Sequence, residues 1–572
     1  MAQHSFKDRI YHLFAITRWK QMANRKTAGT DLIAGITVAL VAIPQSLAYA
    51  QLAGVPAYFG LYAALIPTVI GALFGSSNQL STGPVAMTSL LTAASIAPLA
   101  AHGSALFYSY AILLALVSGL FQIAFGLLRM GILLNFLSNP VLMGFINAAA
   151  IIIGLSQLPA LLGIPAAQSE HFMLDIIQVL LHIDTAHALS LGFGVSAILM
   201  LVSFKKLAPK LPGVLITVAF LTWISYAISY GNLGGRIVGH VPQGLPTLSL
   251  PPLDWHATVA LLPASFVIAL LSFMEAMSSC KVIAIKTRQP WDENRELIGQ
   301  GLAKVAAAFC QSMPVSGSFS RSALNLASGA TTPLASIVSA IFVLLTLLFF
   351  TSVLFHLPKP VLAAIIMMAV TGLINFQSIK NAWRANKDDG VAAIVTFFAT
   401  LAFAPNIQNG ILTGIILSLS LLLYRMMRPR VAILGLHSDT TLRDAVRHNL
   451  PPLHPKLGAV RFDGALRFVN VSYFEDALLK LERENPEIEC ILIQSSGINE
   501  IDASGIEMLR NLLEHFRNSG IKLSFSGIKK QVSDVMDRTG LTHKIGEQNI
   551  FAADGSAIDE ICLRLDQPRN PA

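Results

Sequence analysis

One arginine lies in a broken stretch between two strongly apolar segments. The stretch, Met313–Asn325, reads MPVSGSFSRSALN. An arginine at membrane depth costs about 2.5 kcal/mol or more, so it is rarely without a function. A helix that begins at such a break directs free amides and the positive end of its dipole to one place. These groups and Arg321 predict an anion-binding site. A loop outside the membrane with an ordinary surface arginine is the alternative.

A carboxyl group lies deep in a second apolar segment. Glu275 occurs in ALLPASFVIALLSFMEAMSSC, far from any loop. Burial favours the protonated form of a carboxyl, so Glu275 is a candidate proton carrier. A fixed ion pair with Arg321 is a second interpretation. Sodium coordination, helped by the Ser279 hydroxyl one helical turn later, is a third.

Other polar residues occur within apolar segments. Gln45 and Tyr49, four residues apart in AIPQSLAYAQLAG, share a helix face. They could offer an amide and a phenol to a substrate, or pack between helices. Lys304 lies close enough to the end of its segment for its ammonium to reach the membrane surface, so we expect it outside the site.

The composition indicates a membrane body with a polar tail. Of 572 residues, 54% are hydrophobic and 13% charged, whereas soluble domains carry about 25% charged residues. Before Val431 there are 24 Lys and Arg and 12 Asp and Glu, a net +12; from there on 16 and 20 give −4. We expect a cytoplasmic N-terminal segment (1–30), a transmembrane domain (31–430), and a linker with a soluble domain (431–572). No basic tract with interleaved aromatics indicates nucleic-acid binding.

Apolar segments of spanning length recur along the membrane body. Twelve full spans and two half-spans that begin at glycine-containing breaks make fourteen passes. The full spans are 32–50, 60–74, 105–128, 140–162, 189–204, 215–230, 260–280, 297–312, 334–355, 361–374, 391–405 and 411–424, and the half-spans are 85–97 and 319–327.

The basic loops predict the orientation. Fourteen passes return the chain to its starting side, and the Lys and Arg clusters near 205–210, 281–295, 380–387 and 425–430 all fall on that side. By the positive-inside rule both termini are cytoplasmic. Residues 4–22 are expected to form an amphipathic helix along the membrane. We expect no removable signal peptide.

The two halves of the body repeat. The break STGPVAMTSL at 81–90 resembles SGSFSRSALN at 316–325, with Gly317 following Gly83 by 317 − 83 = 234 positions. Gln45 and Glu275 are related by a similar offset, 275 − 45 = 230. Paired broken spans in two halves are the best pointer to the midplane site of a transporter, and an odd number of spans per half inverts the repeat. Recurrence of small residues at helix contacts is the alternative.

The tail alternates strands and helices, which predicts an α/β domain. Asp502 and Ser504 fall at a strand-to-helix turn, where Ser504 could be an N-cap or a regulatory position. No phosphate loop or catalytic triad occurs, so we expect no enzyme, catalytic residue or cofactor. Four cysteines (280, 310, 490 and 562) lack metal-ligand spacing and are expected to be structural thiols, with no metal site.

Three stretches resemble the SulP sulfate-permease family, whose animal members form solute carrier family twenty-six. They are PQSLAYAQLAGVPAYFGLYAALIPTVIGALFG, ELIGQGLAKVAAAFCQSMPVSGSFSRSALNLASG and the IDASG-containing tail, which is similar to a STAS domain. The resemblance implies a seven-plus-seven inverted repeat of α-helices with core and gate subdomains, an elevator-like motion and a homodimer. It implies that substrate lies between the two half-helix N-termini, at Val85, Ala86, Phe319, Ser320 and Arg321, with Gln45 and Tyr49 as first-span contacts and Glu275 as the position linked to cation coupling.

Departures from the family pattern are few. Lys304 replaces a common asparagine, and Val85 is small where some members carry an aromatic residue. Ser504 falls at the position that is phosphorylated in the bacterial anti-sigma-antagonist relatives.

We therefore expect a secondary active anion transporter of a bacterial plasma (inner) membrane, importing sulfate with protons. A sodium-coupled bicarbonate carrier, a C4-dicarboxylate symporter and an anion exchanger or channel are the alternatives. A cytoplasmic protein that binds the STAS domain is a further expected partner.

Overall fold

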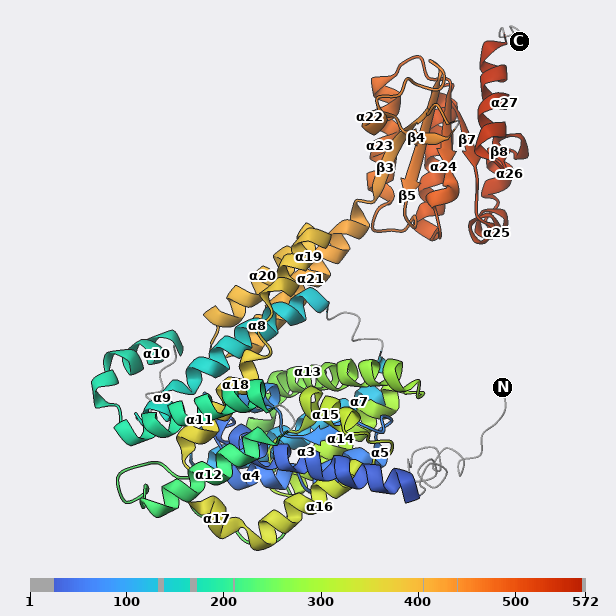
Figure 1. Cartoon of the computed structure of the whole chain (residues 1–572). Coiled ribbons are helices and arrows are strands. Elements are labelled where there is room, and N and C mark those ends of the chain that lie inside the picture. Colours follow the sequence, from blue (N-terminus) through green and yellow to red (C-terminus); the bar gives the residue numbers. More distant parts are fainter. Residues whose placement is uncertain are drawn as a thin grey trace. The chain divides into compact units, whose positions relative to one another are not determined.

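A computed structural model describes residues 25–131, 138–164, 172–208, 211–404, 406–439 and 441–567. The segment at 4–22, expected to form an amphipathic helix, lies outside the described residues. The chain divides into two compact units, the first ending at Ser418 and the second beginning at Leu419 (Figure 1). This division falls inside the helix Ile407–Met427, and the predicted domain boundary at residue 430 comes shortly after that helix, so the domain limits stay a prediction.

The first half of the membrane unit is helical except for one short strand. Its elements are α3 (Arg25–Leu52), α4 (Ala57–Ala63), α5 (Ile66–Phe74), β1 (Ser81–Gly83), α6 (Ala86–Ile96), α7 (Ala105–Leu127), α8 (Asn139–Ser156), α9 (Leu158–Leu162), α10 (Phe172–Leu181), the 3₁₀ turn Ile183–Thr185, α11 (Ala188–Leu207) and α12 (Gly213–Ala227).

The second half repeats this order. Its elements are α13 (Trp255–Thr287), α14 (Glu293–Phe309), β2 (Ser316–Ser318), α15 (Phe319–Ala327), α16 (Leu334–Phe349), α17 (Thr351–Phe355), α18 (Lys359–Thr371), α19 (Phe376–Ala385), α20 (Lys387–Ala402) and α21 (Ile407–Met427). Within the described residues, eight helical segments are long and apolar enough to cross a membrane.

The helices coincide with the predicted spans, and the predicted half-spans are α6 and α15. Two short helices that sequence reasoning missed, α10 and α19, occupy equivalent places, one after α9 and the other after α18. Both expose large apolar side chains, among them Leu174 and Phe376, which suits helices at the surface of a bilayer.

The two halves interlock. In one group of helices, α3 packs on α15 and α16 of the second half, while α13 packs on α6 and α7 of the first. In the other group, α8 packs on α20 and α11 on α18, and α8, α19 and α20 lie side by side (Figure 1). This reciprocal packing is that of an inverted repeat in which the first group of helices is the core subdomain and the second group, with α12 packed on α11, is the gate subdomain.

A buried carboxylate fastens the interlocked halves. The side chain of Asp31 is fully buried in α3. Its Oδ1 accepts a hydrogen bond from the Thr331 amide at 2.7 Å, and its Oδ2 accepts one from the Thr332 hydroxyl at 2.5 Å. Because these donors come from the opposite half, the charge of Asp31 is satisfied only when both halves are in place.

The second unit is an α/β sandwich. Its strands are β3 (Arg430–Leu436), β4 (Leu442–Asp444), β5 (Leu457–Asp463), β6 (Cys490–Gln494), β7 (Lys522–Ser526) and β8 (Ile550–Phe551), in the order β4-β3-β5-β6-β7-β8. The β5 to β8 pairings are parallel, whereas β3 pairs antiparallel with β4 and β5.

Helices cover both faces of this sheet. They are α22 (Ala445–His448), α23 (Val471–Glu484), α24 (Ala503–Asn518), α25 (Lys530–Arg538), α26 (Leu541–Ile545) and α27 (Asp554–Asp566). The cluster that includes Phe474, Leu512 and Phe525 fills one face, from α23 to α26. The smaller cluster of Leu492, Ala557 and Ile561 fills the other, beneath α27.

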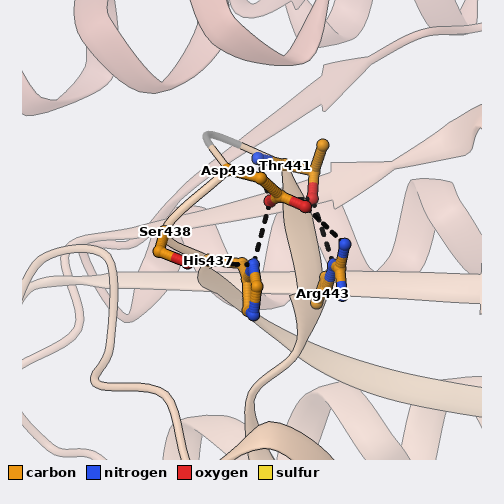
Figure 2. A network of polar contacts seen from close by, with 5 residues as sticks. All are labelled: His437, Ser438, Asp439, Thr441 and Arg443. Carbon is orange, nitrogen blue, oxygen red and sulfur yellow. Dashed lines mark hydrogen bonds and ion pairs between the residues drawn. The ribbon is translucent and has the colours of Figure 1, made fainter.

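A polar network ties β3 to β4 (Figure 2). Asp439 accepts hydrogen bonds from the Thr441 hydroxyl at 2.5 Å and the Thr441 amide at 3.1 Å. Nδ1 of His437 lies 3.0 Å from the same carboxylate, and Arg443 pairs with its other oxygen. The Thr441 hydrogen bonds, followed by those from the other donors, hold the pKa of Asp439 well below its usual range.

Candidate functional site

The two broken spans meet in a short antiparallel ladder. β1 pairs with β2 in the register Ser81–Ser318, Thr82–Gly317 and Gly83–Ser316. All six residues are buried, so α6 and α15 both begin inside the protein, directly after their strands. The ladder therefore brings the positive N-terminal ends of two helices, one from each half, to the same region.

The side chain of Arg321 lies at this meeting point. It is only 2% exposed, and neither terminal guanidinium nitrogen has a hydrogen-bond partner in the part of the chain that the structure describes. A Cβ atom on Gly83 would lie 3.0 Å from Nη2 of Arg321. The glycine at this position of β1 therefore leaves room for the guanidinium. A buried guanidinium without partners is costly. The geometry therefore suits Arg321 to a ligand that carries negative charge.

Glu275 faces the second strand. This residue lies in α13 and is half-buried. Its Oε2 accepts a hydrogen bond from the Ser316 hydroxyl at 3.4 Å, and the same hydroxyl also donates to the Ser272 carbonyl at 2.9 Å. Because the terminal nitrogens of Arg321 have no hydrogen-bond partner among the described residues, the direct Glu275–Arg321 hydrogen bonds of a fixed ion pair are not formed in this structure. The two groups lie in one polar region without neutralising each other by contact.

The Ser279 hydroxyl does not join the carboxylate. It donates to the backbone carbonyl of Glu275 at 3.2 Å, along its own helix. Within the described ranges no group of three or more His, Cys, Asp or Glu could hold a metal ion. The three cysteines 280, 310 and 490 are buried free thiols, and Cys562 is a half-buried one.

Gln45 and Tyr49 come from α3, and both are buried. Tyr49 lies within electrostatic range of Arg321 and Glu275. Gln45, whose Oε1 has no hydrogen-bond partner among the described residues, lines a cavity of about 250 Å³ bounded by α3, α11, α12 and α18. Lys205 lines the same cavity. The side-chain amide of Gln45 thus lines a cavity between the core and gate helices.

The residues at the two helix starts differ in accessibility. Val85 and Ala86 are buried at 3% and 7% exposure, whereas Phe319 is 50% exposed and Ser320 is also exposed. The second half therefore offers the more accessible helix start.

The position of Lys304 differs from the prediction that its ammonium reaches the membrane surface. It is fully buried, and its Nζ donates to Gln122 Oε1 at 2.7 Å and to the Ser272 hydroxyl. The expectation that it reaches the membrane surface is wrong because α14 starts at Glu293, which places Lys304 about 16 Å along the helix at 1.5 Å per residue.

A second buried charge on α14 was also missed. Glu296 is 1% exposed, and its Oε2 accepts from the amides of Ser76 and Ser77 at 2.7 and 2.9 Å. Gln300 donates to Oε1 of Glu296 at 3.0 Å and to Thr82 in β1 at 2.8 Å. Glu296, Gln300 and Lys304 follow each other at four-residue spacing and so share one face of the helix. This row of polar residues in the sequence could have indicated that Glu296 and Lys304 face the protein interior together.

The regulatory candidates lie at the start of α24. Asp502, not Ser504, is the N-cap: its Oδ1 accepts from the Gly505 amide at 2.9 Å, and its Oδ2 accepts from the Phe468 amide at 2.8 Å. The interpretation of Ser504 as an N-cap is therefore wrong, and its interpretation as a regulatory position stays a prediction. Ser504 is half-buried in the first turn of the helix.

Two family models match the chain. The sulfate permease family model covers residues 29–396, and the STAS domain model covers residues 452–557. Sulfate transporter 4.1, chloroplastic, of Arabidopsis thaliana is 33% identical over 98% of this chain and 84% of its own. A probable sulfate transporter of Mycobacterium tuberculosis is 30% identical over 94% of this chain and 95% of its own.

Solved structures share the fold. A murine solute carrier 26 family member A9 anion transporter in the inward-facing state aligns with a TM-score of 0.90 at 21% identity, covering 98% of this chain and 96% of that one. The transmembrane domain of the cyanobacterial bicarbonate transporter BicA aligns with a TM-score of 0.58 at 25% identity, covering 69% of this chain and 98% of that one.

An inverted repeat whose broken helices meet inside the core defines a polytopic membrane transport protein. Because the first family model spans more than half of the sequence, the chain belongs to the sulfate permease family, and its tail carries a STAS domain. The predicted fold class and family are confirmed. The prediction that the chain is not an enzyme is confirmed by its membership in a family of transporters.

Proposed function

We propose that this protein is a secondary active anion transporter that carries sulfate together with protons by an elevator-type motion. One observation carries the proposal: among the residues that the structure describes, neither terminal nitrogen of the buried Arg321, at the start of α15, has a hydrogen-bond partner. A tetrahedral oxyanion would satisfy both the guanidinium fork and the helix amides. The relatives of a plant and a mycobacterium are named as sulfate transporters, which agrees with this substrate.

The packing supports an elevator. The β1–β2 ladder ties both helix starts to the core, so a bound anion would travel with the core as it slides along the gate. The 250 Å³ cavity lined by Gln45 and Lys205 lies between α3 of the core and three gate helices. Lys205 belongs to a basic cluster for which we predict a cytoplasmic position, so we infer that this cavity is the cytoplasmic access path.

Glu275 supports proton coupling. Its carboxyl lies near Ser316, at the strand that leads into α15. Protonation would remove a negative charge from the region where the anion binds, so proton and anion would favour each other's binding reciprocally. Sodium coupling is the weaker interpretation, because the Ser279 hydroxyl donates to the helix backbone and not to a cation position.

The cellular setting is a further part of the proposal. From the basic loops and the family resemblance we propose a bacterial plasma membrane, cytoplasmic termini, a homodimer and a cytoplasmic partner for the STAS domain. The competing functions are transport of bicarbonate, the substrate named for the structural neighbour BicA, transport of C4-dicarboxylates, and anion exchange or channel activity.

Uptake by the purified full-length protein in liposomes tests the proposal. Sulfate, bicarbonate and succinate are offered under imposed proton or sodium gradients, with protein-free liposomes as the control. We expect concentrative sulfate uptake with a proton gradient alone. Bicarbonate uptake that requires sodium would replace the proposal with the competing function.

A further inference from the structure

Two basic residues lie directly opposite each other where the connection after α12 meets the start of α18. An isolated antiparallel bridge joins Ile237 to Pro358, and the Lys359 amide donates to the Arg236 carbonyl at 2.9 Å. Arg236 and Lys359 are therefore the next pair along this bridge, and their charges lie within electrostatic range of each other. Like charges placed directly opposite each other are destabilising.

The backbone keeps the two cations together. Two further hydrogen bonds join the same segments: the Val238 amide donates to the Leu357 carbonyl at 2.9 Å, and the Gly239 amide donates to the Phe355 carbonyl at 3.1 Å. Among the residues that the structure describes, neither cation forms an ion pair with a carboxylate. Because the pair is held in place without such a counter-charge, an anionic ligand would relieve its repulsion.

The pair lies on the side of the membrane where basic residues are not expected. Arg236 follows the predicted span 215–230 and Lys359 follows the predicted span 334–355, the seventh and eleventh passes. With a cytoplasmic N-terminus, an odd number of passes ends on the outer side. The positive-inside rule therefore accounts for the basic clusters at the cytoplasmic ends of the helices and not for these two residues.

Exposed aromatic side chains lie on the helices that lead to the pair. In α12, Phe220, Trp223 and Tyr226 are exposed, and their three-residue spacing places them at neighbouring positions of the helix surface. The Tyr226 ring packs edge-on against the His356 ring, with 4.9 Å between centroids, and Phe355, the last residue of α17, is exposed. Tryptophan and tyrosine are enriched where a membrane meets water. This surface of α12 and α17 therefore suits contact with lipid.

We propose that Arg236 and Lys359 bind the phosphate group of an anionic phospholipid of the outer leaflet, whose acyl chains lie along the exposed face of α12 and α17. A guanidinium contacts two phosphate oxygens at once, and the lysine ammonium adds a second positive charge. Two cations favour a headgroup with a net negative charge, such as that of phosphatidylglycerol, because the choline of phosphatidylcholine would bring a further positive charge to the pair. Free phosphate offers the same oxygens but has no acyl chains to cover the exposed aromatic rings.

The bound lipid would act on the gate subdomain. Because α12 packs on α11, and α18 packs on α8 and α11, both segments that carry the pair belong to the gate. A phosphate group that bridges Arg236 and Lys359 would hold the outer ends of α12 and α18 together. This inference goes beyond the proposed anion transport and does not depend on it.

Lipid titration of the full-length protein in detergent tests the inference. Phosphatidylglycerol and phosphatidylcholine with identical acyl chains are compared, and inorganic phosphate is added in a separate arm. Native mass spectrometry gives the dissociation constant of the tightest-bound lipid, and thermal unfolding gives the shift in midpoint. The test variants are Arg236→Gln and Lys359→Gln. Lys281→Gln, which removes a half-exposed lysine of α13, is the matched control.

We expect the wild type to bind phosphatidylglycerol more tightly than phosphatidylcholine. Each glutamine variant should raise the dissociation constant for phosphatidylglycerol about fivefold, the usual contribution of one Lys or Arg at an anionic membrane surface, whereas Lys281→Gln should leave it unchanged.

The variant Lys359→Glu should have two opposite effects. Its carboxylate would pair with Arg236, so the unfolding midpoint without lipid should rise, whereas the further stabilisation by phosphatidylglycerol should be lost. This variant keeps the inference testable if the glutamine variants do not fold.

Three results would overturn the inference. The first is equal affinity of the wild type for the two lipids, or an unchanged affinity for phosphatidylglycerol in the folded variants. The second is stabilisation by inorganic phosphate that equals stabilisation by phosphatidylglycerol, which would assign the pair to a free anion. The third is a changed oligomeric state of Lys359→Glu in the absence of lipid, which would assign this surface to contact between two copies of the chain.

Discussion

Thr82 and Gly317 are paired partners in the ladder that joins the two halves of the membrane unit. The offset of 234 positions that relates the halves converts this pair into Gly83 and Ser316, which are also partners. These two pairs are thus related by the axis of the inverted repeat, whereas the third pair, Ser81 and Ser318, has no counterpart within the two strands. Arg321 follows β2 in α15, and no arginine follows β1 in α6. The positive charge proposed to bind the anion is therefore contributed by the second half alone.

Replacing Arg321 tests the anion site. Arg321→Ala should abolish sulfate binding and uptake because the helix amides alone would have to hold a dianion. Arg321→Lys should restore little, since an ammonium cannot make the bidentate contact of a guanidinium. Arg384→Ala, an exposed arginine of α19, is the control for loss of charge. Uptake by Arg321→Ala at wild-type affinity would remove this residue from the site.

Replacing Glu275 tests coupling. In the wild type, external acid should raise sulfate uptake, because protonation removes repulsion between carboxylate and dianion. Glu275→Gln mimics the protonated form, so it should bind sulfate and exchange it across the membrane. Accumulation driven by a proton gradient should disappear. If the variant still concentrates sulfate as the wild type does, the coupling residue lies elsewhere.

Removing the STAS domain tests the division of labour. A chain that ends after Arg430 should keep a folded membrane unit, since the two units pack within themselves. Its sulfate dissociation constant should equal that of the full chain, measured in the same detergent, while the transport rate is free to change. A monodisperse truncation that binds no sulfate would show that the tail takes part in binding.

The start of α24 allows a direct comparison of two side chains. Asp502→Ala should cost the STAS domain about 0.5–2 kcal/mol as the loss of an N-cap. Ser504→Ala should change stability by less than about 0.5 kcal/mol, as for a surface position outside such features. Protection of the α24 amides from hydrogen exchange measures both. If Ser504→Ala alters transport without altering protection, position 504 is regulatory.

The Asp439 network predicts a pH dependence. The pKa of Asp439 is lowered in the folded state, so the unfolded state binds the proton more readily. The carboxylate therefore stabilises the β3–β4 connection at neutral pH, and this contribution is lost as the pH falls below the ordinary value of about 3.9. Asp439→Asn should reduce amide protection in β3 and β4 at pH 7, with a difference from wild type that shrinks in acid. A difference that grows in acid would contradict this sign.

Sequence reasoning located Glu275 and Arg321 because each is the single charged residue of its stretch, Ala260–Cys280 for Glu275 and Met313–Asn325 for Arg321. The first stretch is otherwise almost entirely apolar, and the second is a serine- and glycine-containing break between two apolar segments. Lys304 and Glu296 were missed because they lie on a helix that starts with charged residues, and only the path of α14 into the interior shows that they are buried. Likewise, both Asp502 and Ser504 suit an N-cap, and the position of the first helical turn decides between them.

The spans were predictable from hydropathy alone, but their partners were not. The length of an apolar segment indicates that a helix can cross the membrane, but it does not indicate which other helix that helix contacts. The packing of α3 on α16, and of α13 on α7, depends on surfaces far apart in the chain. The matching breaks at Gly83 and Gly317 were the exception, because their similarity indicated a common meeting point.

The contact between Asp31 and Thr331 spans 300 positions. At ribosomal rates of about 5–20 residues per second, its donors emerge roughly 15–60 s after the carboxylate does. Throughout that interval the first half is without its interlocking partners and leaves an acidic group unsatisfied. Assembly of the core must therefore wait for late translation, and we expect a nascent chain stalled before α16 to be a substrate for quality-control proteolysis.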